Sequence, residues 1–161
     1  MNKLVGVISD THGLLRPEVL VAFKGVDLIL HAGDIGGPEV LDGLRTLAPT
    51  VAVRGNNDRG DWASNVPEVE RTQVGNVSIY MLHDVKTLDK RLVSGFDVVI
   101  SGHSHQPRIE RRDGILFVNP GSAGPRRFKL PISIAKLVVA ESTVTAELIG
   151  LLPNVTVKNV R

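Results

Sequence analysis

The amino-acid sequence predicts an α/β fold in which two packed, mixed β-sheets are flanked by helices. Short runs of Val, Ile and Leu recur along the chain, and each run ends in a cluster of Gly, Asp, Asn or His. The first third alternates such runs with amphipathic helical stretches, which is typical of a parallel sheet. The last third joins the runs by short turns, which is typical of antiparallel strands. The length of 161 residues suits one compact domain, so we predict a single domain over residues 1–161.

The N-terminal third predicts a βαβαβ unit. A nearly continuous apolar run over residues 4–8 predicts a buried strand, and apolar positions within residues 17–24 predict a short helix. Residues 27–31 predict the second strand, and residues 38–47 predict a second helix because their apolar side chains fall on one stripe. Residues 50–53 predict the third strand. Strands that are connected through helices run parallel.

The rest of the chain predicts a second sheet. Residues 68–74 and 77–82 predict antiparallel strands that meet at a Gly75-Asn76 turn, and residues 86–93 predict a modest helix. Residues 97–101 predict another buried strand. Four more predicted strands, joined by turns, cover residues 107–112, 115–118, 133–139 and 142–149.

Composition excludes several classes of protein. The 19 Lys and Arg residues nearly balance the 17 Asp and Glu residues, so no basic surface indicates a nucleic-acid partner. The absence of cysteine excludes a disulfide scaffold, a cysteine nucleophile and a thiolate metal site. Residues 1–10 do not form a signal peptide, and no apolar run approaches the ~20 residues that span a membrane. We therefore expect a cytoplasmic protein without a membrane partner; the sequence leaves a homo-oligomer open.

Polar side chains follow five of the predicted strands, at the point where each strand ends. Because the carboxyl ends of the strands in an open α/β sheet line one crevice, we expect these segments to converge. Oxygen and imidazole donors without thiolates suit Mn, Fe, Co, Ni or Zn. The five segments are Asp10-Thr11-His12, Gly33-Asp34, Gly55-Asn56-Asn57-Asp58, His83-Asp84 and Gly102-His103-Ser104-His105.

With these motifs in this order, the chain resembles the calcineurin-like metallophosphoesterases, and most closely the small YfcE-like and archaeal phosphodiesterase branch. The stretch Asn119-Pro120-Gly121-Ser122, followed by Pro125-Arg126, also looks like this branch. The resemblance implies a metallophosphoesterase-like αββα sandwich and two divalent metal ions, with Mn²⁺ preferred over Ni²⁺, Co²⁺, Fe²⁺ or Zn²⁺. It implies that the first metal is held by Asp10, His12 and His105, that the second is held by Asn56, His83 and His103, and that Asp34 bridges the two.

The same resemblance implies a metal-dependent hydrolase of small phosphate esters. A hydroxide that bridges the two metals would attack phosphorus, so no side-chain nucleophile is needed. Many family members have a His after the ligand Asn that assists the leaving group, whereas this chain has Asn57, which cannot act as a general acid. This difference favours a phosphodiesterase over a monoesterase. His83 is followed by Asp84 where the family usually has Gly.

Several further residues have two interpretations. Asn57 and Arg126 are candidates for substrate binding, although Arg126 also fits an ordinary solvated loop. Asp58 either orients a ligand or caps a turn. His31 either donates a hydrogen bond to the site or is a satisfied core histidine. Trp62 either stacks on a substrate base, lines a dimer contact or has an ordinary packing role.

For the whole protein, the alternative function is a non-catalytic interaction scaffold of the same fold, similar to the retromer subunit. Degenerate ligands would favour that scaffold, and the ligand positions here are intact.

Overall fold

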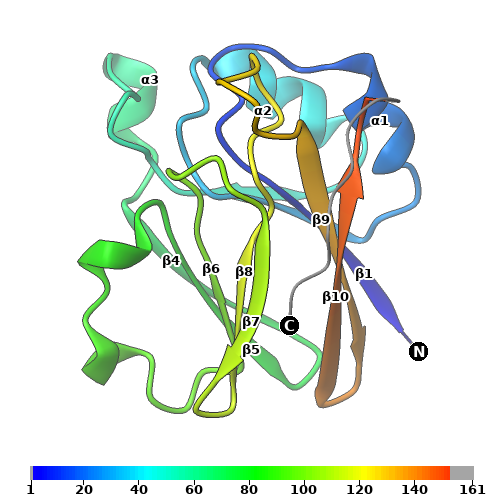
Figure 1. Cartoon of the computed structure of the whole chain (residues 1–161), viewed down its shortest axis with the longest axis vertical. Helices are drawn as coiled ribbons and strands as arrows, with labels where there is room; N and C mark the ends of the chain where they lie inside the picture. Colours follow the sequence, from blue (N-terminus) through cyan, green and yellow to red (C-terminus); the bar gives the residue numbers. More distant parts are fainter. Residues whose placement is uncertain (1, 153–161) are drawn as a thin grey trace.

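The computed structural model describes residues 2–152, which contain two five-stranded sheets (Figure 1). The first sheet has the strand order β10-β9-β1-β2-β3. Strands β1, β2 and β3 run parallel, whereas β9 is antiparallel to both β1 and β10. Its strands are β1 (Lys3–Ile8), β2 (Leu28–His31), β3 (Thr50–Ala52), β9 (Ser133–Ala140) and β10 (Thr143–Gly150).

The second sheet has the strand order β4-β5-β6-β8-β7. Strands β5, β6 and β8 run parallel in its centre, and antiparallel pairing adds β4 and β7 at the two edges. Two mixed sheets were predicted, and this is confirmed. The predicted run of late strands is divided, however, because β9 and β10 return to the first sheet. The strands of the second sheet are β4 (Val69–Val74), β5 (Val77–Leu82), β6 (Val98–Ile100), β7 (Arg108–Arg112) and β8 (Ile115–Asn119).

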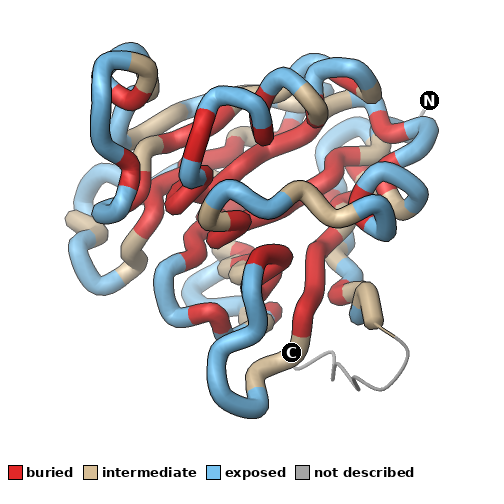
Figure 2. Tube along the Cα trace, turned by 90° about the horizontal axis from the view of Figure 1, so that it is seen from above, coloured by how far each residue is buried: buried red, intermediate tan, exposed pale blue. Residues whose placement is uncertain are grey.

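The first sheet is buried on both faces. In β1, Val7 faces a core between the two sheets, which it shares with Ile79 and Ile100, because alternate residues of a strand point to opposite faces. Ile8 faces a second core under α1 (Pro17–Ala22) and α2 (Pro38–Arg45), where Phe23 is fully buried. The buried stretches therefore run through the middle of the molecule, and exposed loops surround them (Figure 2).

The segment between β5 and β6 differs from the prediction. Instead of a helix over residues 86–93 it forms two short 3₁₀ turns, η1 (Val85–Thr87) and η2 (Lys90–Leu92). The reason is local: the carboxylates of Asp84 and Asp89 accept the backbone N–H groups of Lys86 and Arg91 and start a separate turn each time.

A one-turn helix that the sequence did not predict, α3 (Asp61–Ser64), follows β3. Within residues 2–152 no helix has the length and apolar character needed to cross a membrane. The prediction of one domain over residues 1–161 stays a prediction, and it includes residue 1 and residues 153–161, which lie outside the described residues.

Candidate metal centre

The predicted ligands lie where five strands end. Asp10 and His12 follow β1, Asp34 follows β2 and Asn56 follows β3, all in the first sheet. His83 follows β5, and the pair His103 and His105 follows β6, both in the second sheet. Each sheet contributes side chains to one site because these strands run parallel within their sheets.

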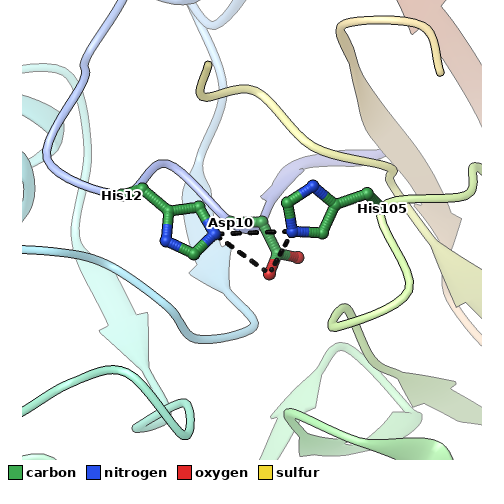
Figure 3. Close-up of side chains that lie close together, drawn as sticks. All are labelled: Asp10, His12 and His105. Atoms are coloured by element: carbon green, nitrogen blue, oxygen red, sulfur yellow. Dashed lines mark hydrogen bonds and ion pairs between the residues drawn. The ribbon is translucent and has the colours of Figure 1, made fainter. Parts of the chain in front are cut away.

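Asp10, His12 and His105 form a first group (Figure 3). Oδ1 of Asp10 lies 3.3 Å from Nε2 of His105 and 3.8 Å from Nε2 of His12. The two imidazole Nε2 atoms are 3.4 Å apart. Three potential ligand atoms from loops far apart in the sequence thus face one point.

The carboxylate of Asp10 is held in one orientation. Its Oδ2 accepts hydrogen bonds from Oγ of Ser9 at 2.7 Å and from the backbone N–H of His103 at 3.0 Å. Its Oδ1 is buried and has no hydrogen-bond donor. Gly102 is required here because a Cβ at this position would collide with Oγ of Ser9. The bare oxygen is therefore aimed at the imidazoles.

Asn56, His83 and His103 form a second group. Nδ1 of His103 lies 3.2 Å from Oδ1 of Asn56 and 3.3 Å from Nε2 of His83. Nδ1 of His83 contacts the carbonyl oxygen of Ala32 at 2.8 Å, and a carbonyl only accepts, so Nδ1 carries the hydrogen. In the neutral imidazole of His83 the lone pair is then on Nε2, toward the group.

Asp34 lies between the two groups. Its Oδ2 is 3.8 Å from Nε2 of His12 in the first group and 3.3 Å from Nε2 of His83 in the second. The side-chain amide of Asn57 donates to this same oxygen at 3.0 Å, and the backbone N–H of Asn57 donates to Oδ1 at 2.9 Å. Counting only carboxylates and imidazoles, Asp10, Asp34 and His83 also form a possible metal-binding group.

Both carboxylates favour the ionised form. Burial opposes ionisation of Asp10, but its interactions with His105 and Ser9 outweigh burial and lower its pKa. Burial likewise opposes ionisation of Asp34, and the interaction with His83 together with the N–H of Asn57 lowers its pKa. For His83, burial is outweighed by Asp34 and by the carbonyl of Ala32, which raises the pKa of the imidazole.

The backbone at the centre adopts an uncommon conformation. In the described part of the chain, eight non-glycine residues have a positive φ, and five of them are predicted ligands. A positive φ costs free energy at a non-glycine residue, so it persists only where the surrounding structure fixes the backbone. The concentration of such residues here indicates a site whose geometry is fixed by its surroundings. The five are Asp10 (56°), His12 (47°), Asp34 (54°), His103 (70°) and His105 (61°).

Two candidates from the sequence support this backbone. The carboxylate of Asp58 accepts three backbone N–H groups, those of Ile35, Gly36 and Gly55, at 2.9–3.1 Å, and so ties the loop of Asp34 to the loop of Asn56.

His31 is fully buried, and its Nδ1 accepts the N–H of Gly33 while its Nε2 contacts Oγ1 of Thr11. It is a satisfied core histidine whose bonds end beside Asp34 and Asp10. Its complete burial lowers its pKa to about 4.

Three supporting residues were not predicted as such. Ser9 orients Asp10, and Oγ of Ser122 donates to the backbone carbonyl of Asp10 at 3.0 Å. The amide of Asn119 donates to the carbonyl of Gly102 at 3.0 Å and to Oγ of Ser104 at 3.1 Å, which holds the loop of His103 and His105. The only signals in the sequence were the flanking position of Ser9 and the Asn119–Ser122 stretch.

The remaining candidates lie at the margin. Arg126 is exposed on a loop that begins at Gly124, against the backbone of Asp10 and Thr11. Trp62 packs partly buried against the core under the helices, which favours the packing interpretation. Asp84 caps η1, and its Oδ2 is 3.8 Å from Nε2 of His103.

The donor set fits divalent metal ions. The bare Oδ1 of Asp10 would be costly without a positive partner, since a buried charged group that lacks a donor has lost its hydration. Ionised carboxylates, imidazoles and an amide oxygen are ligands of borderline divalent metals. The arrangement can therefore hold cations in either group, with Asp34 reaching both.

Comparisons with known proteins identify the family. Residues 4–142 match the model of the calcineurin-like phosphoesterase superfamily domain. The chain is 41% identical over 159 residues to a probable metallophosphoesterase of Methanothermobacter thermautotrophicus, covering 91% of each chain. It is 28% identical over 137 residues to the phosphodiesterase MJ0936 of Methanocaldococcus jannaschii, covering 73% of this chain and 82% of the relative.

Two solved structures have the same fold. Wild-type Vps29 of Entamoeba histolytica in complex with Zn²⁺ has a TM-score of 0.71 at 26% identity, with 92% of this chain and 99% of the other covered. The phosphoesterase YfcE of E. coli has a TM-score of 0.64 at 20% identity, with 92% and 100% covered.

The depressed pKa of His31 predicts a pH-dependent loss of stability. Between the ordinary pKa of 6.5 and the folded value of about 4, the unfolded chain binds a proton that the folded chain does not. Stability contributed by neutral His31 is therefore complete above pH 6.5 and falls by about 3 kcal/mol as the pH drops to 4.

The free energy of unfolding is measured by urea denaturation at pH 7, 6, 5 and 4 for the chelated wild type and for the chelated His31→Gln variant. The difference between the two isolates His31, because all other groups titrate in both proteins. We expect the advantage of the wild type over the variant to shrink with acidification. A constant difference between the two would show that His31 does not titrate in this way.

Proposed function

The chain belongs to the calcineurin-like phosphoesterase superfamily, in the small branch of YfcE and MJ0936, and we propose that it is a phosphodiesterase that uses two divalent cations. We propose seven ligands: Asp10, His12 and His105 for one cation, Asn56, His83 and His103 for the other, and Asp34 between them.

The observation that carries the proposal is the bare oxygen of Asp10. Oδ1 is buried without a donor and faces Nε2 of His105, His12 and His83 at 3.3, 3.8 and 3.9 Å. A carboxylate that served only the fold would be expected to have both oxygens satisfied, as buried polar groups normally are. Here one oxygen is fixed by two donors and the other is left for a cation.

The charge of such a centre would attract a phosphate ester. Two divalent cations carry +4, and the ionised carboxylates of Asp10 and Asp34 return −2, so the centre stays positive. When bound, a pair of divalent cations can activate water at neutral pH and neutralise charge on the phosphoryl oxygens. The chain's own part is to hold the ligands rigidly and to keep Asp34 oriented through Asn57.

Asn57 supports a diester rather than a monoester substrate. Its amide cannot release a proton to a leaving group, and it is engaged with Oδ2 of Asp34. Substrates with acidic leaving groups are then favoured. The name of the relative MJ0936, a phosphodiesterase, agrees with this preference. Arg126, exposed on the loop beside the backbone of Asp10, is the proposed contact for a further substrate oxygen.

The alternative is a non-catalytic interaction scaffold of the same fold, and the fold alone does not decide between an enzyme and a scaffold. The complete set of ligand types, with Asp34 set between the two groups, favours the enzyme.

Metal removal tests the function directly. We expect the purified protein to hydrolyse bis(p-nitrophenyl) phosphate and its activity to fall at least ~100-fold after chelation. When Mn²⁺, Ni²⁺, Co²⁺, Fe²⁺ and Zn²⁺ are added back separately, we expect Mn²⁺ to restore the highest activity. The assay is release of p-nitrophenolate at fixed pH. A protein inactive with every metal on diesters and monoesters alike would favour the scaffold.

The bridging role of Asp34 is tested by Asp34→Asn. An amide keeps the shape but removes the charge shared by the two groups, so we expect kcat/KM to fall at least ~100-fold with the fold retained. Metal content by elemental analysis should drop below two ions per chain. Asp42→Asn, at an exposed position of α2, is the matched control. Wild-type turnover in Asp34→Asn would refute the bridge.

The ester preference is tested at Asn57. Asn57→His supplies a group that can donate a proton to a poor leaving group, so we expect the ratio of phenyl phosphate to bis(p-nitrophenyl) phosphate hydrolysis to rise by about 10-fold or more. Asn57→Ala is the control, because it loses the same amide bond to Asp34 without gaining an acid. If both variants show the wild-type ratio, position 57 does not set the preference.

A further inference from the structure

A cavity of about 730 Å³ lies on the outer face of the second sheet, away from the metal centre. We call it the outer pocket. It is bordered by the segment of η1 and η2, which lies beside the second sheet in Figure 1, and by the β7–β8 hairpin. Its volume is within the ~300–1,000 Å³ of small-molecule sites. Six residues that line it carry the argument: Lys86, Leu88, Lys90, Phe96, Ile115 and Phe117.

The face beneath the pocket is apolar although no α-helix covers it. In β8, Leu116 and Val118 point into the core between the sheets, so Ile115 and Phe117 point outward. A sheet face that meets water normally carries polar residues at such positions. Both outward side chains are instead apolar and only partly buried. The first sheet has α1 and α2 over its outer face, whereas here two short turns leave space.

The floor of the pocket is rigid. The ring of Phe96 packs edge-to-face on Tyr80, with ring centroids 5.5 Å apart. The guanidinium of Arg112 lies 4.3 Å from the ring centre of Phe117 and is paired with Glu110. Two aromatic rings held in this way form a rigid apolar floor, which an apolar ligand can cover without reordering the protein.

The side chains that line the pocket carry one more positive than negative charge, with Lys86, Lys90 and Arg112 against Asp97 and Asp113. Of its acidic residues, Asp97 accepts the N–H and Oγ of Ser78, and Asp113 lies in the β7–β8 turn. Asp89, next to Lys90, is engaged by Arg91 through three hydrogen bonds. Across residues 2–152, neither Lys86 nor Lys90 takes part in an ion pair. Both ammonium groups are therefore available to an anion.

From this combination we propose that the outer pocket binds a small organic anion with an apolar body. The body, aryl or alkyl, lies on Phe96, Ile115 and Phe117, and the acidic group lies between Lys86 and Lys90. None of these residues belongs to the proposed metal centre, so binding here does not depend on the phosphodiesterase function.

The probe is 1-anilinonaphthalene-8-sulfonate, which joins an aromatic body to one anionic group. Fluorescence titration of the full chain should show saturable binding at one site, with Kd on the order of 10–100 μM. Amide chemical-shift changes should concentrate in residues 85–97 and 112–117. Displacement by 2-naphthoate and by decanoate distinguishes an aryl from an alkyl ligand, and uncharged decanol should displace the probe at least ~10-fold less well than decanoate.

Variants separate charge from shape. Lys86→Glu with Lys90→Glu should weaken probe binding at least ~10-fold. Lys3→Glu with Lys24→Glu makes the same charge change at exposed positions in β1 and in the turn after α1, and it should not weaken binding. Ser94→Trp should block binding by filling the cavity, because Ser94 lines it at an exposed position. Hydrolysis of bis(p-nitrophenyl) phosphate should stay at the wild-type rate in all of these variants.

Four results would overturn the proposal. Shift changes centred outside the pocket would place the probe elsewhere. Equal weakening in both double variants, or equal displacement by decanol and decanoate, would show that the lysines do not select an anion. Failure of both 2-naphthoate and decanoate to displace the probe would exclude the ligand class.

Discussion

The structure is organised around one buried charge, the carboxylate of Asp10. A buried ionised group is stable only with compensating partners, and these are divided between its two oxygens. Oδ2 receives Ser9 and the backbone of His103, which orients the group. Oδ1 receives no donor and faces imidazole nitrogens from both sheets. Three proposed ligands, His12, His83 and His105, therefore surround an oxygen that no hydrogen-bond donor occupies.

The backbone around this carboxylate is strained, and hydrogen bonds hold it in place. Five proposed ligands have left-handed backbone, which is tolerated because hydrogen bonds from outside each loop hold the chain. Asp58 joins the loops that follow β2 and β3, and Asn119 holds the loop that follows β6. His31, the last residue of β2, accepts the N–H of Gly33 in the loop of Asp34 and has a lowered pKa. Such a site is formed before substrate arrives, so binding energy is not spent on ordering it.

Much of this could be predicted from the sequence, for identifiable reasons. The five polar segments were recognisable because Gly, Asp, Asn and His cluster after apolar runs, and parallel strands bring such ends together. The proposed ligand set came from the family resemblance. The sheet that β9 and β10 join was not predictable, because an antiparallel strand has the same sequence pattern in either sheet. The helix over residues 86–93 failed because Asp84 and Asp89 bind backbone N–H groups locally. The roles of Ser9 and Ser122 depend on tertiary contacts that no short pattern encodes.

The most direct test of the account is anomalous diffraction from crystals soaked in Mn²⁺. The account predicts two peaks ~3.5–4 Å apart, one against Asp10, His12 and His105 and the other against Asn56, His83 and His103, with Asp34 contacting both. Anomalous maps that are empty at this site in fully soaked crystals would contradict it. So would two well-occupied ions that Asp34 does not join.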